Sequence, residues 1–266
     1  MCVNKTVYSV LIDEHIQWLR TFGQQRIKKW EDLLNSNDEA AICEALVRKM
    51  LSGEGVNIEP CEDLSSGGLD FLCQKLDKKF YTEVTCITKE TATKKTKLSA
   101  EPEINGLSIW YKPPTEQILE ELRKKAPKCA NLDSPCLLAI CTLYFGAGFI
   151  CFRDRIIAES VLTGTPHFSW SIDTGSGKVL KEPHQSTELK DSGFIRPQRN
   201  KLYSIEEARK TISAVLLVDC WSIPVNTVGV LHPNPNYPFD RTLLPSVKFA
   251  RLSDGWQNGS LKIEWI

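Results

Sequence analysis

Apolar side chains recur at helical spacing through the first fifty residues. From about Ile12 to Asn35, apolar positions follow one another at intervals of three and four, which predicts a helix. A second helix is predicted to follow, because Asn37 or Asp38 can cap its start and Gly53 or Gly55 can end it. We therefore expect a helical N-terminal part of the chain.

The pattern then changes to the short apolar runs of strands. Residues 55–62, "GVNIEPCE", alternate apolar and polar side chains, and residues 69–76 and 78–87 are two further strand-like runs. The intervening Lys75–Lys78 is short enough for a hairpin, so the last two strands are predicted to be antiparallel neighbours. After them, Thr115–Lys128 predicts a helix, and the near-continuous apolar run of residues 134–145 predicts a strand that is covered on both faces.

The remaining segments are polar or mixed. Residues 88–103 are rich in lysine and predict an exposed loop. Residues 151–162 suggest a helix, residues 204–220 begin like a helix and continue like a strand, and residues 226–239 read as a strand that enters a proline-rich loop. No repeat or low-complexity linker is visible. We expect one α/β domain over residues 1–266, with a core over about 38–145 and a C-terminal α/β extension over about 146–266.

Composition bounds the class of protein. The chain has 266 residues, of which 42 % are hydrophobic and 25 % charged, so it can bury a large core. Its 33 Lys and Arg balance its 33 Asp and Glu, so no global field attracts it to nucleic acid or to an anionic membrane. Any polyanion must therefore be bound locally. The N-terminus shows no signal-peptide pattern and the chain no membrane-span pattern, so we expect a cytoplasmic protein without a membrane partner.

Cysteine is frequent, but its spacing is not that of a metal site or a disulfide framework. The ten cysteines form no CxxC pair, and most lie in apolar stretches such as "PCLLAICTL". Disulfide frameworks belong to small secreted domains, and zinc sites usually have closely spaced ligand pairs. We interpret these residues as reduced core thiols.

Two acidic residues, Asp70 and Glu83, lie in or next to strand-like runs that are otherwise apolar enough to be buried in a core. Side chains alternate along a strand, so Glu83 shares a face with Tyr81 and Thr85 and points where apolar partners are expected. Direct pairing in the hairpin brings Asp70 within reach of Glu83. Two such carboxylates repel, and a hard divalent cation bound through oxygen would stabilise both as anions. The alternative interpretation is an exposed edge-strand Glu83 and an Asp70 that merely follows a turn.

These residues resemble a known family of enzymes. "GGLD" and "EVT", with twelve residues between the two acids, resemble the signature of the PD-(D/E)XK, or restriction-endonuclease-like, nucleases. The core of that family is a helix, three antiparallel strands, a helix and a further strand, which is the order expected over Asp38–Phe145. The resemblance implies Mg²⁺ or Mn²⁺ as cofactor, with Asp70, Glu83 and the main-chain carbonyl of Val84 as metal ligands. It also implies Glu44, in "ICEAL", as an auxiliary carboxylate.

The chain departs from the family signature at its lysine. Thr85 stands where the family has the lysine that helps to activate the attacking water, whereas Leu69 in place of proline is a minor change. A lysine of the helix predicted over residues 115–128 is the expected substitute, Lys125 ahead of Lys124, provided that the end of that helix lies at the pocket. A polar stripe runs along this helix opposite its apolar side. The alternative to a role at the pocket is that this stripe is simply a solvated face of the helix. The stripe comprises Gln117, Glu121, Lys124 and Lys128.

The prediction for function is a metal-dependent endonuclease that hydrolyses phosphodiester bonds, in DNA rather than RNA. Residues 88–128 contain nine Lys and Arg against six acids, a local excess that could contact phosphates. Trp110 and Tyr111 offer stacking on bases, with core packing as the alternative. Two further hypotheses remain: a catalytically inactive nuclease fold that binds nucleic acid or a protein partner, favoured by Thr85, and a structural α/β protein without a site. A homodimer is compatible with the sequence.

Overall fold

The computed structural model describes most of the chain. The residues described are 8–63, 68–96, 112–144, 155–164, 167–169, 172–180, 184–186, 192–194, 210–221, 225–254 and 262–266. Within them the protein is a mixed α/β protein, with N-terminal helices and one mixed eight-stranded sheet with interspersed helices. Trp110 and Tyr111 lie outside the described residues.

Three helices form the N-terminal layer: α1 (Ser9–Arg20), α2 (Gln24–Ser36) and α3 (Asp38–Gly53). The prediction of one helix up to Asn35 is wrong, because Gly23 separates α1 from α2 with a φ of 111°, which residues with a side chain rarely adopt. The predicted start of α3 is confirmed. The side chain of Asn37 accepts a hydrogen bond from the Ala40 N–H at 3.2 Å.

The eight strands of the main sheet lie in the order β1-β2-β3-β4-β7-β8-β9-β10. The pairs β1–β2, β2–β3, β7–β8 and β9–β10 are antiparallel, and β3–β4, β4–β7 and β8–β9 are parallel. The strands that follow β4 thus extend the same sheet. Their bounds are β1 (Asn57–Pro60), β2 (Phe71–Lys75), β3 (Lys78–Ile87), β4 (Cys136–Thr142), β7 (Ala214–Asp219), β8 (Asn226–Leu231), β9 (Lys248–Leu252) and β10 (Ile263–Trp265), beside a separate two-stranded pair of β5 (His167–Ser169) and β6 (His184–Ser186).

The predicted hairpin between β2 and β3 is confirmed. Leu76 and Asp77 turn the chain with φ values of 51° and 61°, the left-handed conformation that a two-residue hairpin loop requires at both positions. Phe71 pairs with Thr82. The residues just beyond this pair, Asp70 and Glu83, therefore stand opposite one another at the open end of the hairpin.

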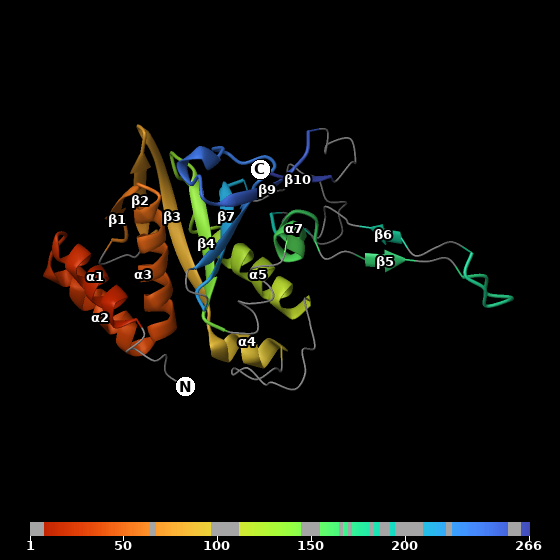
Figure 1. Ribbon diagram of the computed structural model, residues 1–266, viewed down its shortest axis with the longest axis horizontal. Helices are drawn as coiled ribbons and strands as arrows, with labels where there is room; N and C mark the ends of the chain where they lie inside the picture. Colours follow the sequence, from red (N-terminus) through yellow and green to blue (C-terminus); the bar gives the residue numbers. More distant parts are fainter. Residues whose placement is uncertain are drawn as a thin grey trace.

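The other helices cover the second face of the sheet. Residues 88–103 were expected to be a loop, yet α4 (Lys89–Thr96) occupies part of them, and the Thr88 hydroxyl caps it by accepting from the Thr91 N–H at 3.2 Å. It is followed by α5 (Lys112–Lys125) and α7 (Arg155–Thr163). One apolar core lies between α1–α3 and the sheet, and a second between α5, α7 and the opposite face (Figure 1). As predicted for a strand covered on both sides, every residue of β4 is buried.

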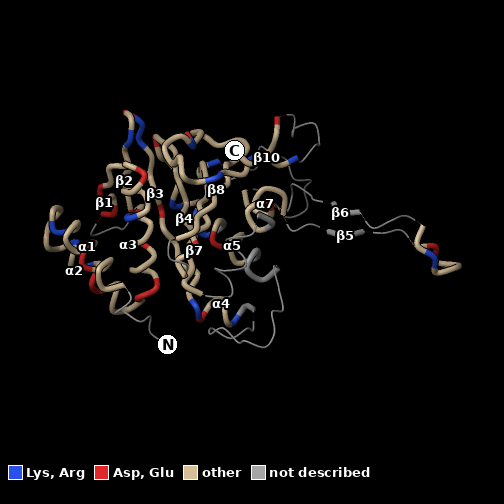
Figure 2. The backbone as a smooth tube through the Cα atoms, in the orientation of Figure 1, with Lys and Arg blue, Asp and Glu red and all other residues tan. Residues whose placement is uncertain are grey.

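Charge is dispersed over this architecture. Lys and Arg are interspersed with Asp and Glu along the described helices and strands (Figure 2). No helix of the described part combines the length and the apolar character that crossing a membrane requires. Any binding of a polyanion therefore depends on a local site.

Candidate functional site

Asp70 is held at the point where β2 and β3 part. Its Oδ2 accepts a hydrogen bond from the Val84 N–H at 2.6 Å. Burial raises the pKa of Asp70 to about 7, the charge of Glu83 acts in the same direction, and the Val84 N–H, Lys128 and Lys125 oppose it. Asp70 is partly exposed to a cleft, yet protein surrounds most of its carboxyl group.

Glu83 is completely buried in the middle of β3, at 0 % exposure. Its Oε1 accepts hydrogen bonds from the ammonium groups of Lys125 at 2.8 Å and Lys128 at 2.7 Å. Among the described residues, Glu83 Oε2 has no hydrogen-bond partner. Ionised carboxylates are buried only when they are paired, so the two lysines stabilise this one while leaving one of its oxygens for another ligand.

The two lysines come from the end of α5 and the turn that follows it. Lys125 is the last residue of α5, and the Lys128 N–H donates to its carbonyl at 3.0 Å. Burial lowers the pKa of Lys128, but the ion pair with Glu83 and the charges of Asp70 and Glu62 outweigh it, so the pKa is raised overall. Lys124 points elsewhere, to Glu120 and Glu121, at 3.1 Å each. The structure therefore brings Lys125 to Glu83, as expected, and does not bring Lys124 there.

The polar stripe of α5 lies against the sheet. Gln117 is only 5 % exposed, and its Nε2 donates to Glu121 Oε1 at 3.1 Å. The Thr85 hydroxyl donates to the other oxygen of Glu121 at 3.0 Å. A solvated face is thus the wrong interpretation for Gln117, Glu121 and Lys128, because Thr85 and Glu83 give these polar groups partners on β3. The hydroxyl of Thr85 is thus already hydrogen-bonded to α5.

A cleft of about 200 Å³ opens beside Asp70 on the side of the N-terminal helices. Glu44 and Glu62 line it together with Asp70. The pKa of Glu44 is raised well above its usual range, mainly by burial. The negative charges of Asp70, Glu62 and Glu83 raise this pKa further, and the positive charge of Lys128 lowers it. The cleft is lined by Leu19, Arg26, Lys29, Trp30, Leu33, Glu44, Pro60, Glu62 and Asp70.

Two cations of α2 flank the acidic end of the cleft. Lys29 Nζ lies 3.1 Å from Glu62 Oε1, and Arg26 Nη1 donates to the Glu62 carbonyl at 3.1 Å. Sequence reasoning missed Glu62 and assigned Lys128 only to the polar stripe. The alternation in "NIEPCE" could have placed Glu62 at the end of β1, whereas no local pattern links Lys128 to Glu83.

Asp70 and Glu83 offer the type of donor atom that a hard divalent cation takes. Carboxylate oxygens are the ligands that Mg²⁺ prefers, and Asp70 and Glu83 lie close enough for the charge of Glu83 to raise the pKa of Asp70. The buried Oε2 of Glu83 has no hydrogen-bond partner among the described residues, and a ligated cation would satisfy it. Val84 contributes its N–H to Asp70 here, so the role of its carbonyl as a ligand stays a prediction.

Comparison with known proteins gives no identity to this site. No protein-family model, curated protein or solved structure matches the chain.

Proposed function

We propose that the chain is a metal-dependent nuclease of the restriction-endonuclease-like type that hydrolyses phosphodiester bonds in DNA. The order of elements supports the proposal. α3 precedes the antiparallel strands β1, β2 and β3, and β4 follows α4 and α5 and pairs with β3 in parallel. This order agrees with the core that the sequence resemblance implies, with one helix more between β3 and β4.

The observation that carries the proposal is the surroundings of Glu83. A completely buried carboxylate that is opposite Asp70 and bonded to two lysines is expensive to maintain for structure alone, because an apolar residue of similar size usually serves a core as well. Such an arrangement of charged groups beside a cleft is typical of a functional site.

Each residue then has a part in the chemistry. Asp70 and Glu83 would hold Mg²⁺ or Mn²⁺, with Glu44 as an auxiliary carboxylate at the same cleft. When bound, the cation supplies charge neutralisation at the phosphate and lowers the pKa of the attacking water. Lys125 and Lys128 bond to Glu83 and would place positive charge on the face of β3 that Glu83 shares with Thr85, the position of the family's lysine.

The formal charges of the site are consistent with a phosphodiester substrate. Counted as fully ionised, Asp70, Glu83 and Glu44 would together carry one more negative charge than Lys125 and Lys128 compensate. A divalent cation would turn this excess into one positive charge. That charge complements the single negative charge of a DNA phosphodiester and offsets the repulsion between the clustered acids.

The second candidate function is an inactive nuclease fold that binds nucleic acid or a protein partner. It rests on Thr85, whose hydroxyl is bonded to Glu121, and on lysines that are both already paired with Glu83. In that case the lysines only neutralise a retained acid.

Cleavage of DNA distinguishes the two candidates. Protein stripped of metal by a chelator is incubated with supercoiled plasmid and labelled duplex DNA, with Mg²⁺, with Mn²⁺ and without metal. We expect cleavage that requires metal and that falls by orders of magnitude in Asp70→Asn and Glu83→Gln, because each variant loses a carboxylate ligand. Glu264→Gln is the matched control, since Glu264 lies on β10 at the far edge of the sheet and pairs with Arg251.

The contrary outcome is also defined. Wild-type protein that binds DNA and never cuts it with either metal, alongside a Thr85→Lys variant that does cut, would establish the inactive fold. Circular dichroism and thermal melting of every variant show whether a loss of cleavage reflects loss of folding.

A further inference from the structure

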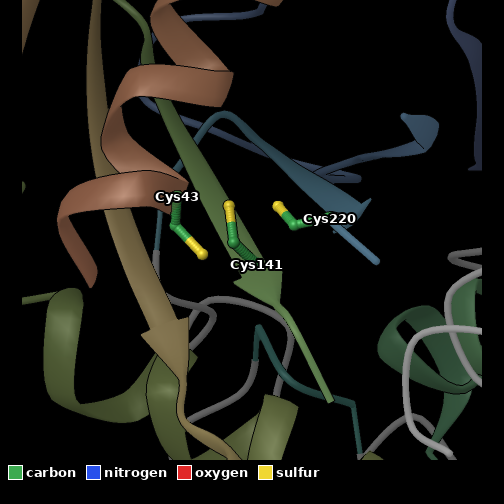
Figure 3. Close-up of side chains that lie close together, drawn as sticks. All are labelled: Cys43, Cys141 and Cys220. Atoms are coloured by element: carbon green, nitrogen blue, oxygen red, sulfur yellow. The ribbon is translucent and has the colours of Figure 1, made fainter. Parts of the chain in front are cut away.

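Three cysteines that are far apart in the sequence converge under α3. Cys43 lies on α3, Cys141 on β4, and Cys220 directly follows β7. Their sulfur atoms all lie within 4.8 Å of one another, and all three residues are buried (Figure 3). Figure 3 shows the three side chains close together between the helix and the sheet.

A fourth thiol stands beside this group. Cys86 Sγ lies 3.4 Å from Cys43 Sγ. Cys86 and Cys141 are register partners on the parallel strands β3 and β4, so their side chains leave the same face of the sheet. The cluster of Cys43, Cys86, Cys141 and Cys220 therefore spans three adjacent strands and the helix packed on them.

We propose that this cysteine cluster is a structural zinc site, with Cys43, Cys141 and Cys220 as ligands and Cys86 as the donor nearest to the fourth position. Sulfur is the only donor type that the cluster offers, and thiolates select zinc and other soft ions over Mg²⁺. In a tetrahedral site with Zn–S bonds of about 2.3 Å, neighbouring sulfurs lie about 3.8 Å apart. Small side-chain rotations therefore suffice to close the observed spacing.

The chemistry of binding balances without any oxidant or reductant. Each thiol that becomes a ligand releases one proton, and the thiolate sulfur donates an electron pair to Zn²⁺.

The surroundings favour a structural over a catalytic role. Catalytic zinc keeps an open position for water, whereas the three ligands proposed here are completely or almost completely buried in the apolar core between α1–α3 and the sheet. The site would fasten α3 to β4 and β7. It is independent of the nuclease proposal, since it lies on the other side of β3 from Glu83 and shares no residue with the carboxylates.

Sequence reasoning missed the site because the ligands come from separate elements. Pairs such as CxxC reveal zinc sites only when two ligands lie on one turn. Here each ligand comes from a different element, and the parallel pairing of β3, β4 and β7 brings them together.

Metal analysis and cobalt substitution test the proposal. The chain is purified without a histidine tag under anaerobic reducing conditions, and its zinc content is measured by mass spectrometry. It is then unfolded with a chelator and refolded with Co²⁺, because the buried cluster is closed to ions in the folded protein. We expect close to one zinc per chain, one Co²⁺ per chain with the visible and sulfur-to-metal bands of tetrahedral cobalt thiolate, and displacement of these bands by Zn²⁺.

Single substitutions assign the ligands. Cys43→Ser, Cys141→Ser and Cys220→Ser should each weaken Co²⁺ binding by more than the roughly 10- to 100-fold that loss of a supporting second-shell group costs. Cys73→Ser is the matched control, because Cys73 is buried in the same core and its sulfur lies 3.4 Å from Thr82 Oγ1 rather than in the cluster. It should bind Co²⁺ like the wild type.

Four outcomes would overturn the zinc site. The first is fully reduced wild-type protein that folds without metal and shows no cobalt thiolate bands. The second is binding of Cu(I) without binding of Zn²⁺ or Co²⁺, and the third is the chromophore of an iron–sulfur cluster. The fourth is a Cys43–Cys86 disulfide in freshly purified protein. The wild-type measurements need no variant to fold. Loss of DNA cleavage with zinc retained, or the reverse, separates failure of the nuclease proposal from failure of this one.

Discussion

Glu83 is the residue on which the account of function rests. Strand alternation and the hairpin predict its position opposite Asp70, and the structure adds the lysines at 2.8 and 2.7 Å from its Oε1. The lysine partners could be predicted only in part, because Lys125 was expected at the pocket and Lys128 was not. Thr85 itself does not indicate which lysines take the place of the family's lysine, because these lysines reach Glu83 only through the packing of α5 on β3.

The paired lysines lead to a prediction for activity. Lys125→Met and Lys128→Met each remove one ammonium from Glu83 while keeping much of the side-chain volume. We expect each to reduce metal-dependent cleavage on the order of 100-fold, the effect of losing one preorganised charged donor. Single-turnover cleavage rates at saturating Mg²⁺ measure this. Lys124→Met is the control, because Lys124 pairs with Glu120 and Glu121; an equal loss in Lys124→Met would contradict the assignment.

His15 gives a prediction for stability against pH. The ring is completely buried and stacks on Trp30 at 4.6 Å between centroids, and Arg48 Nε donates to its Nδ1 at 3.2 Å. Burial, and then the charge of Arg48, lower the pKa of His15 to about 3. Between this value and about 6.5, the unfolded chain binds a proton at His15 that the folded protein does not, so the contribution of His15 to folding stability falls as the pH drops below about 6.5.

The size of this effect follows from linkage. At about pH 5.5, His15 should cost about 1.4 kcal/mol of unfolding free energy relative to pH 8. Urea denaturation of the wild type and of His15→Gln at both pH values measures it, since glutamine cannot titrate. The wild type should lose about 1.4 kcal/mol more than the variant on acidification. Equal losses in the two proteins would show that His15 is protonated in the folded state.

At the scale of elements, local sequence patterns predicted the fold well wherever residues near the end of a helix or strand determine where it begins or turns. Asn37 capped α3 as expected, and the short Lys75–Lys78 connection gave the antiparallel hairpin. Two predictions failed for physical reasons. Apolar spacing continues across Gly23, so periodicity alone did not show the break between α1 and α2. The lysine-rich α4 has almost no apolar face to signal a helix, and its Thr88 cap went unrecognised.

A glycine on β8 offers a test of packing between strands. Gly229 is the register partner of Phe249 on β9, and a Cβ added at Gly229 would collide with the Phe249 ring. Phe249 is completely buried, so the ring has little room to move. Gly229→Ala should therefore destabilise the protein by about 1–3 kcal/mol through overpacking. Urea denaturation measures the change.

The matched control for this substitution is Gly53→Ala. Gly53 ends α3, and no atom lies within 4 Å of the position of an added Cβ. Alanine should be neutral or stabilising there by up to about 1 kcal/mol, because glycine is a poor helix former. An unchanged stability of Gly229→Ala would mean that the β8–β9 contact is looser than the structure shows.

At the scale of the whole molecule, function depends on groups that only the assembled sheet brings together. Asp70 and Glu83 could be predicted from the hairpin, and Glu44 from its helix. Lys128 and the cysteine cluster could not, because they meet their partners through the packing of α5 and α3 on opposite faces of β3 and β4. Their contacts join residues that no short motif connects.

The central claim is that Asp70 and Glu83 share a divalent cation, and anomalous diffraction from a crystal grown with Mn²⁺ tests it most directly. We expect an anomalous peak that both carboxylates contact at about 2.0–2.6 Å, with Glu83 still bonded to Lys125 or Lys128. The same experiment on Glu83→Gln should lose the peak. An Mn²⁺ ion found elsewhere, or no peak although both carboxylates are ordered, would contradict the metal site and with it the proposed nuclease.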